Sequence, residues 1–312
     1  MIFFPYKVDL NLNRFPIWTI LIILICIGVH FAQQASFRKI IKYAETFCTQ
    51  EHSRAFWLAI EKVSREAGPL GCAQAMLAIH NEIDHAGMIE KLAKEATPYE
   101  TISIEAGRRR NVEQLTEAYE SFGSSVPKDL TRKLVYDPRS YKFETMVSAA
   151  FAHGGWDHLI GNLFFFFAFA ATVEAIVGFL VFPLLILGLC LGTQLAYSLW
   201  TLSTASSIPT LGLSGVVMGM IGLFTYFLPT AGIKCFVWVL IWLRTFVIPA
   251  WILMVWFVGW DIYHLAGDQG ETGINLMAHV SGAAMGLLLG LLFFRMRRQD
   301  VQEDFQAVSR RF

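Results

Sequence analysis

The stretch GLSGVVMGMIGLFTYFL, residues 212–228, combines Ser214 with four glycines in a run that is otherwise apolar. A second stretch, AHVSGAAMGLLLG, residues 278–290, carries His279 and three glycines at four-residue spacing. Each stretch gathers small residues on one helix face, and small residues let membrane helices approach closely. We therefore predict two helices in close contact, which brings Ser214 and His279 together. The glycines assigned to this contact are Gly212, Gly215, Gly219, Gly282 and Gly286.

The composition around these stretches is that of an integral membrane protein. Of 312 residues, 55% are hydrophobic and only 16% are charged, and the mean hydropathy is +0.48, well above that of an ordinary soluble domain. The 25 basic residues balance the 25 acidic ones, so no net charge favours nucleic acid or an acidic substrate. The five cysteines show no close Cys-Cys or Cys-His spacing typical of a structural metal site.

Six apolar runs are long enough to be membrane helices, which need about 20 residues each. The fold class is therefore all-α, a polytopic membrane protein with six transmembrane helices. The fifth run contains Arg244, so we interpret 235–243 as an interfacial stretch that leads to a span beyond Pro249; a single longer tilted helix is the alternative. The predicted spans are roughly 16–33, 158–177, 179–200, 211–228, 246–261 and 276–294.

Basic residues set the predicted orientation. Lys7 and Arg14 precede the first span, and Arg295, Arg297 and Arg298 follow the last, so we expect both termini in the cytoplasm. A cleaved signal peptide at the N-terminus is the competing interpretation, although the residues after the first apolar run make a poor cleavage site. The predicted parts are the N-terminus with helix 1 (1–33), an extracytoplasmic insertion (34–143), the core with helices 2 to 6 (144–298) and a cytoplasmic tail (299–312).

The insertion between the first two spans has mixed charge and a helical pattern. Gly68-Pro69 and Thr97-Pro98 divide it into pieces. Cys48 and Cys72 both lie in it, and either a disulfide or two free thiols fits the sequence. The apolar residues that recur at three- and four-residue spacing are Phe56, Ile60 and Val63, then Ala75, Ile79 and Ile83, then Leu115, Ala118 and Phe122.

Three of the membrane helices begin with residues suited to acyl transfer. That chemistry needs a nucleophile, a base and donors for an oxyanion. Ser214 is the candidate nucleophile and His279 its general base, while the side chains of His158 and Asn162 and the backbone amide of Ser214 are candidate oxyanion donors. The glycines alone are explained by helix packing, but packing does not explain the histidine. We expect no metal, since the His-Glu-X-X-His pattern of metalloproteases is absent from the sequence. We also expect no cofactor, because the Ser-His dyad is complete without one.

Other polar residues of the apolar region receive structural interpretations. Glu174, near the end of the second span, is interpreted as a buried or interfacial structural partner. Asp261 is interpreted as part of a solvated loop, and we expect no acid to complete a triad with His279. Polar residues between spans are expected to retain water near Ser214: Thr193, Gln194, Ser206 and Ser207.

From about Val135 to Arg298 the chain resembles the rhomboid intramembrane serine proteases. The resemblance lies in the order and spacing of three motifs, His158-X-X-X-Asn162, Gly212-X-Ser214-Gly215 and Ala278-His279-X-X-Gly282-X-X-X-Gly286. It implies a six-helix bundle with a short fourth helix, and a Ser-His dyad that works without an acid. Two positions depart from the family pattern: Glu144-Thr145 replaces a common Trp-Arg pair, and Met218 replaces an aromatic residue.

The resemblance implies an intramembrane serine endopeptidase that cleaves transmembrane protein substrates in or next to their membrane segments. A catalytically silent rhomboid-like protein that binds or escorts membrane clients is the alternative. A transporter is a third possibility, which the absence of paired half repeats disfavours. The expected partners are the lipid bilayer and transmembrane substrates, with no nucleic acid and no metal, and the expected location is a bacterial inner membrane.

Overall fold

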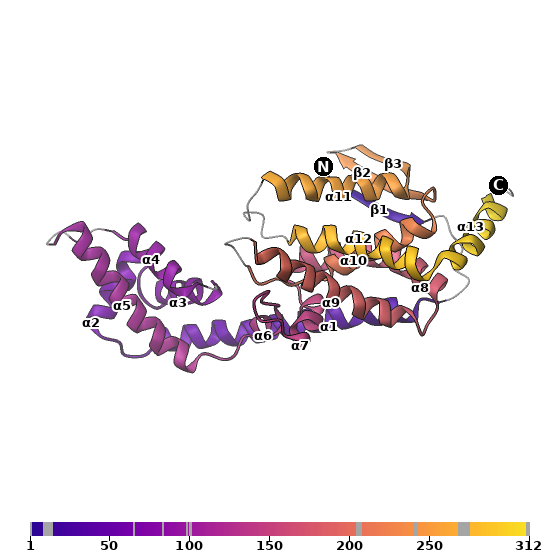
Figure 1. Cartoon of the computed structure of the whole chain (residues 1–312). Coiled ribbons are helices and arrows are strands. Elements are labelled where there is room, and N and C mark those ends of the chain that lie inside the picture. Colours follow the sequence, from indigo (N-terminus) through magenta and orange to yellow (C-terminus); the bar gives the residue numbers. More distant parts are fainter. Residues whose placement is uncertain are drawn as a thin grey trace. The chain divides into compact units, whose positions relative to one another are not determined.

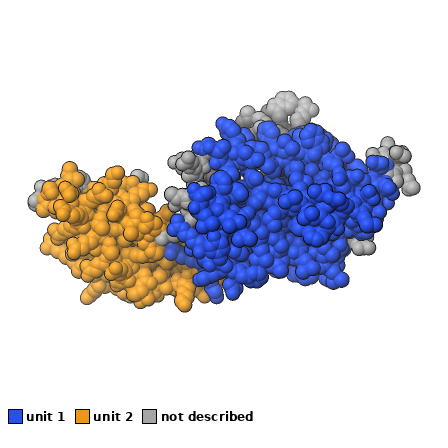
Figure 2. All heavy atoms as spheres, viewed as in Figure 1, with its two compact units in different colours: residues 1–31, 131–312 blue, residues 32–130 orange. Residues whose placement is uncertain are grey.

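The structure is a computed structural model, and it describes residues 2–8, 15–64, 66–82, 84–97, 99, 102–203, 208–239, 242–267 and 275–309. The chain forms two units, which Figure 2 shows in blue and orange. Unit 1 consists of residues 1–31 and 131–312, and unit 2 of residues 32–130.

The predicted helical membrane bundle is confirmed in unit 1. Five described helices are long and apolar enough to cross a membrane, and a sixth apolar helix, α10, has only 14 residues. At 1.5 Å per residue α10 is about 21 Å long, which is less than the hydrocarbon thickness of a bilayer. The six helices are α1 (Ile17–Cys48), α8 (Trp156–Val177), α9 (Phe182–Thr201), α10 (Ser214–Phe227), α11 (Ala250–Gly267) and α12 (Leu276–Phe293).

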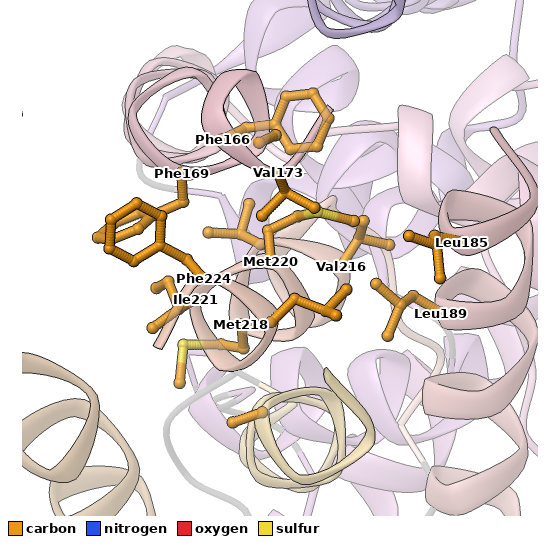
Figure 3. Packing of buried hydrophobic residues seen from close by; sticks show 14 of the residues in the cluster. Phe166, Phe169, Val173, Leu185, Leu189, Val216, Met218, Met220, Ile221 and Phe224 are labelled. Atoms are coloured by element: carbon orange, nitrogen blue, oxygen red, sulfur yellow. The ribbon is translucent and has the colours of Figure 1, made fainter. Parts of the chain in front are cut away.

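Helix α10 is the centre of unit 1. Every one of its residues from Gly215 to Phe227 is buried, and it contacts α8, α9, α11 and α12. Figure 3 shows side chains of α8 and α9 packed around Val216, Met220 and Phe224 of α10. Because α10 is surrounded by protein, it can be shorter than the membrane is thick without exposing its polar ends to lipid.

Glu174 of α8 holds the start of α1. Its carboxylate accepts hydrogen bonds from the backbone amides of Trp18 (2.9 Å) and Thr19 (2.8 Å) and from the hydroxyl of Thr19 (2.7 Å). The first amides of a helix lack acceptors within the helix and favour a negative charge. Glu174 is only 5% exposed. The prediction that it is a buried structural partner is therefore confirmed.

Side chains of the helix α13 (Arg295–Ser309) contact the C-terminal ends of α8 and α10. The Arg297 side chain donates from Nε to the carbonyl of Ile176 (3.0 Å), near the end of α8. The amide of Gln302 donates to the carbonyl of Phe227 (3.1 Å), the last residue of α10. These side chains satisfy carbonyls that have no partner within their own helices.

A three-stranded antiparallel sheet was not predicted. It has the order β1-β2-β3 and is drawn beside α11 in Figure 1. The strands are β1 (Ile2–Val8), β2 (Gly232–Val239) and β3 (Trp242–Pro249). The described residues of the predicted interfacial stretch 235–243 lie in β2 and β3. Residues 246–249, with which the predicted fifth span begins, also belong to β3, and α11 begins at Ala250, beyond Pro249. Short apolar runs rich in β-branched and aromatic residues do not distinguish a strand from a helix.

Unit 2 contains the end of α1, which continues as a helix 15 residues beyond the predicted limit at residue 33. The intervening residues include no glycine or proline, so nothing in the sequence stops the helix. The other helices of unit 2 are α2 (Arg54–Val63), α3 (Gly68–Asn81), α4 (His85–Glu95) and α5 (Ile104–Ser125). Two short helices, α6 (Leu130–Leu134) and α7 (Phe143–Ser148), and a 3-10 turn (Ala149–Phe151) lead to α8.

The helical pattern predicted for the insertion is confirmed where it is described. Its periodic residues form the core of unit 2, and the predicted break at Gly68-Pro69 coincides with the start of α3. Ile83 and Pro98 lie outside the described residues. Cys48 of α1 and Cys72 of α3 form a disulfide, with their Cα atoms 5.8 Å apart. Of the two states that the sequence allowed for this pair, the structure contains the bonded one.

Candidate active site

Ser214 is the first residue of α10, and the segment before it is held by backbone hydrogen bonds. The amide of Gly212 donates to the carbonyl of Ala149 (2.8 Å), and Thr210 exchanges two hydrogen bonds of 2.9 Å with Tyr136. Gly212 has φ +120°, a conformation that residues with a Cβ rarely adopt. This conformation and these bonds fix the entry into α10, and with it the position of Ser214.

The backbone amide of Ser214 is suited to bind an anion. An amide in the first turn of a helix has no acceptor within that helix, and the helix dipole places partial positive charge there. Ser214 is partly buried, while Leu213 before it and Gly215 after it are buried. The predicted oxyanion donor at this position therefore lies at the start of a helix whose remaining residues are excluded from solvent.

His158 and Asn162 lie against the segment that leads into Ser214. The ring atoms Cε1 and Nε2 of His158 would be 2.7 and 2.8 Å from a Cβ placed on Gly212, and Nδ2 of Asn162 would be 3.8 Å from it. Asn162 donates one hydrogen bond from Nδ2 to the carbonyl of His158 (2.9 Å), and its amide group has a second N–H. Both side chains are therefore next to the residue two positions before Ser214.

The contact between α10 and α12 is made by backbone atoms. A methyl group added to Gly282 would collide with the carbonyl oxygen of Gly215, and one added to Gly286 would collide with that of Gly219. A Cβ on Gly215 would be 3.3 Å from the carbonyl oxygen of Ala278. Gly215 directly follows Ser214 in the chain, and Ala278 directly precedes His279. The contact between Gly215 and Ala278 therefore places the backbones of Ser214 and His279 on adjacent turns of two helices in contact.

Two residues that the sequence analysis did not single out connect the starts of these helices. Asn275 caps α12, because its Oδ1 accepts a hydrogen bond from the amide of Ala278 (2.9 Å). Its Nδ2 donates to the hydroxyl of Thr210 (3.3 Å), four residues before Ser214. An asparagine directly before an apolar helical run is a recognisable capping signal. Nothing in the sequence indicates its second partner.

The interpretation of Asp261 as part of a solvated loop is wrong. Helix α11 continues to Gly267, six residues past the predicted end of the fifth span. Asp261 consequently lies on a helix, with its side chain 13% exposed. Its Oδ2 is 3.1 Å from Nδ1 of His279. An acid thus contacts the candidate base, contrary to our expectation of none.

The other ring nitrogen of His279 is available for chemistry. Nε2 is buried and has no hydrogen-bond partner in the described part of the chain. The structure therefore contains no hydrogen bond between this nitrogen and the hydroxyl of Ser214. Such bonds are often long or absent before substrate binds and form in the complex. Ser214 and His279 are partly buried, at the starts of their helices.

A small cavity adjoins Ser214. Its volume is about 10 Å³, on the order of the space that one water molecule needs. Thr193 and Gln194 of α9, both predicted to retain water, are among its lining residues, and the buried Oε1 of Gln194 has no partner among the described atoms. Ser206 and Ser207, the other two residues predicted for this role, lie outside the described residues.

His153 precedes α8 and packs edge-on against the ring of His158, with 5.2 Å between ring centroids. It is 2% exposed. Burial, with a smaller contribution from His158, lowers the pKa of His153 to about 4, so its ring is neutral at physiological pH. Among the residues that the structure describes, no three His, Cys, Asp or Glu side chains are grouped to hold a metal ion.

Comparison with known proteins identifies the family of this chain. Residues 141–296, half of the chain, match the model of the rhomboid domain. A relative, Rhomboid protein 1, mitochondrial, of Saccharomyces cerevisiae, is 28% identical over 173 residues, which are 54% of this chain and 47% of the relative. The chain therefore spans about half the length of the curated relative that it matches. A matched domain that contains all three helix starts, in a bundle of apolar helices, places this chain in the rhomboid family of integral membrane proteins.

Proposed function

We propose that this protein is an intramembrane serine endopeptidase that hydrolyses peptide bonds in or next to transmembrane segments of other membrane proteins. The convergence of three helix starts carries the proposal. The His158 ring lies against Gly212, and the carbonyl of Ala278 lies against Gly215. A serine, a histidine and two further polar side chains are thereby gathered around one short stretch of backbone, at residues 212–215.

In this mechanism Ser214 attacks the carbonyl carbon of the substrate peptide bond. As the Oγ–C bond forms, the hydroxyl proton passes to Nε2 of His279, and negative charge develops on the carbonyl oxygen. The amide of Ser214, the Asn162 side chain and the His158 ring donate hydrogen bonds to that oxygen. When the C–N bond breaks, His279 gives the proton to the leaving amine. A water molecule then hydrolyses the acyl ester by the same steps, and Ser214 is regenerated.

The water for the second step is held in the small cavity beside Ser214. Thr193 and Gln194 supply polar groups to its wall, and a buried amide oxygen without a partner favours an ordered water. Gly212 and Ser214 line the same cavity. Water held there lies beside the acyl ester that it must attack, although apolar helices surround the site.

The substrates are membrane proteins whose transmembrane helix opens easily. A peptide bond in a regular helix within lipid is protected, because breaking its hydrogen bonds leaves polar groups unsatisfied. We expect small residues at the cleaved bond and glycine or proline nearby, since these weaken a helix. The substrate helix enters laterally past α11, of which only Ala250 and Leu253 are buried.

We also propose that both termini are cytoplasmic and that unit 2 lies outside the cytoplasm, in a bacterial inner membrane. The disulfide between Cys48 and Cys72 supports this orientation, because disulfides persist mainly in oxidising compartments. The basic residues after α12 favour the same orientation for the C-terminus.

The test is cleavage of a fluorescent transmembrane substrate by the full-length protein in lipid vesicles. We expect the wild type to cleave and both Ser214→Ala and His279→Ala to lose at least about 1000-fold in rate, as removal of a nucleophile or base does. Ser281→Ala is the matched control. Ser281 lies two residues after His279, and its hydroxyl donates to the carbonyl of Ala278 (3.3 Å) in its own helix.

Cleavage that survives Ser214→Ala would exclude Ser214 as the nucleophile. A wild type that binds the substrate stably without cleaving it would support the alternative, a silent rhomboid-like protein that holds membrane clients. Crosslinking between the substrate helix and α11 distinguishes such binding from failure of the substrate to enter.

A further inference from the structure

Among the residues that the structure describes, one carboxylate contacts the candidate base, and it comes from a different helix. Oδ2 of Asp261, on α11, is 3.1 Å from Nδ1 of His279, on α12. The two side chains are only 13% and 16% exposed. A contact between largely buried partners is screened less by water and salt than a surface ion pair. This carboxylate therefore has more influence than a solvated carboxylate on which nitrogen of the imidazole carries the proton.

The chemistry of the two groups fixes the position of one proton. An ionised carboxylate can only accept hydrogen bonds, so the nitrogen that faces it must carry a hydrogen. In neutral His279 the proton is then on Nδ1, and Nε2 is bare. Nε2 is the buried nitrogen that has no partner among the described residues. A bare nitrogen is the form that can accept the hydroxyl proton of a serine.

We propose that Asp261 is a positioning residue for His279. Its carboxylate holds the imidazole in the tautomer with the proton on Nδ1, orients the ring, and stabilises the imidazolium that forms when Ser214 loses its proton. In this role Asp261 acts only through His279, and bond making and breaking stay with Ser214 and His279. This inference rests on the proposed function, and it makes the catalytic group a Ser-His pair supported by an acid from α11.

The contact also connects catalysis to the position of α11. Only Ala250 and Leu253 of α11 are buried, and Met254, Phe257 and Val258 are partly buried against the core. If α11 moves away from α12, the carboxylate leaves Nδ1 and the tautomer of His279 is no longer fixed. His279 is therefore held in the tautomer with a bare Nε2 only while the part of α11 around Asp261 stays beside α12.

The test measures the tautomer of His279 directly. Full-length protein labelled with 15N-histidine, in lipid nanodiscs, gives the tautomer of each ring by NMR, and the His279→Gln variant identifies the signals of His279. We expect a protonated Nδ1 and a bare Nε2 in the wild type. In Asp261→Asn we expect a mixture of tautomers or the opposite one, because an amide can donate to Nδ1 as well as accept. Asp261→Glu should restore the wild-type tautomer at least in part.

Kinetics supply the second readout. We expect Asp261→Asn to lower kcat by about 100-fold or more with KM nearly unchanged, as when an acid that orients a histidine is lost. Asp261→Glu should recover part of that loss. Tyr263→Phe, at an exposed position of the same helix, is the matched control and should change neither the tautomer nor kcat.

The two proposals fail in different ways. A His279 tautomer that is the same in the wild type and in Asp261→Asn would overturn the role of Asp261, whether or not the protein cleaves. An unchanged kcat in Asp261→Asn would overturn it as well. If instead the tautomer depends on Asp261 but the wild type cleaves nothing, the positioning role stands and the proposed protease function fails.

Discussion

The contact between α10 and α12 in unit 1 and the core of unit 2 are built in opposite ways. In unit 1, glycines bring two backbones together, with Gly282 against the carbonyl of Gly215. In unit 2, large rings fill the interior, and those of Phe47 and Phe122 are 5.4 Å apart. Lipid is as apolar as a side chain, so membrane helices gain from close fit, whereas a domain in water gains from burying large apolar groups.

The largest effect should come from filling the backbone contact in unit 1. We expect the double variant Gly282→Ala/Gly286→Ala to lose about 4 kcal/mol of the free energy of unfolding, since each methyl group meets a carbonyl oxygen and overpacking costs about 1–3 kcal/mol per site. Denaturation of the protein in detergent measures the loss.

The matched control places the same change where the helix surface is open. A Cβ on Gly161 of α8 or Gly188 of α9 meets nothing within 4 Å. Alanine is the better helix former by about 1 kcal/mol. Gly161→Ala/Gly188→Ala should therefore be neutral or slightly stabilising. Equal losses in both double variants would contradict the account of unit 1 as a contact between backbones.

The next effect should be confined to unit 2. Replacement of Cys48 and Cys72 by serine removes its disulfide and should lower its stability by about 3 kcal/mol, mainly because the unfolded chain becomes less constrained. Limited proteolysis between residues 49 and 103 gives a direct readout. A reducing agent should reproduce the effect and leave unit 1 unchanged, because Cys26, Cys190 and Cys235 are free thiols. Destabilisation of both units by the reductant would argue against this separation.

A smaller loss of stability should follow removal of the negative charge that caps the start of α1 in unit 1. Glu174→Gln keeps the shape of the side chain but removes the negative charge of the group that accepts hydrogen bonds from Trp18 and Thr19. We expect it to lower the free energy of unfolding by about 2 kcal/mol, which is typical of a hydrogen bond to a charged group. Thermal unfolding in detergent measures it. Glu303→Gln, at an exposed position of α13, is the control, and an equal change in both variants would rule out the cap.

The smallest effect should come from loss of a helix cap in unit 2, which a residue next to the helix provides. Ser53 is exposed, and its hydroxyl accepts from the amide of Phe56 (3.1 Å) at the start of α2. We expect Ser53→Ala to cost about 1 kcal/mol, roughly half of the loss in Glu174→Gln, because water can replace the lost partner. Hydrogen exchange of the first amides of α2 gives the readout. Ser121→Ala, at an exposed position of α5, should stay within about 0.5 kcal/mol of the wild type.

Local patterns predicted much of the fold. The membrane helices follow from the lengths of their apolar runs, and the helices of unit 2 follow from residues such as Ile60 and Leu115 at helical spacing. The sheet could not be predicted, because Ile2 pairs with Trp238, 236 positions away, and neither strand carries a signal for the other. The continuation of α1 to Cys48 was not predicted. The loss of apolar residues after residue 33 shows where the chain leaves the membrane, but a helix can continue beyond that point.

The sequence by itself determined which residues can carry chemistry and on which helices they lie. Ser214, His279, His158 and Asn162 are polar groups at the starts of apolar helices, and the cost of such groups near lipid makes them conspicuous. Only the tertiary structure decided which partners they meet. The link from Asn275 to Thr210 and the contact of Asp261 with His279 join separate segments of the chain. Such contacts depend on how helices pack and turn relative to one another, and spacing within one segment contains no information about either.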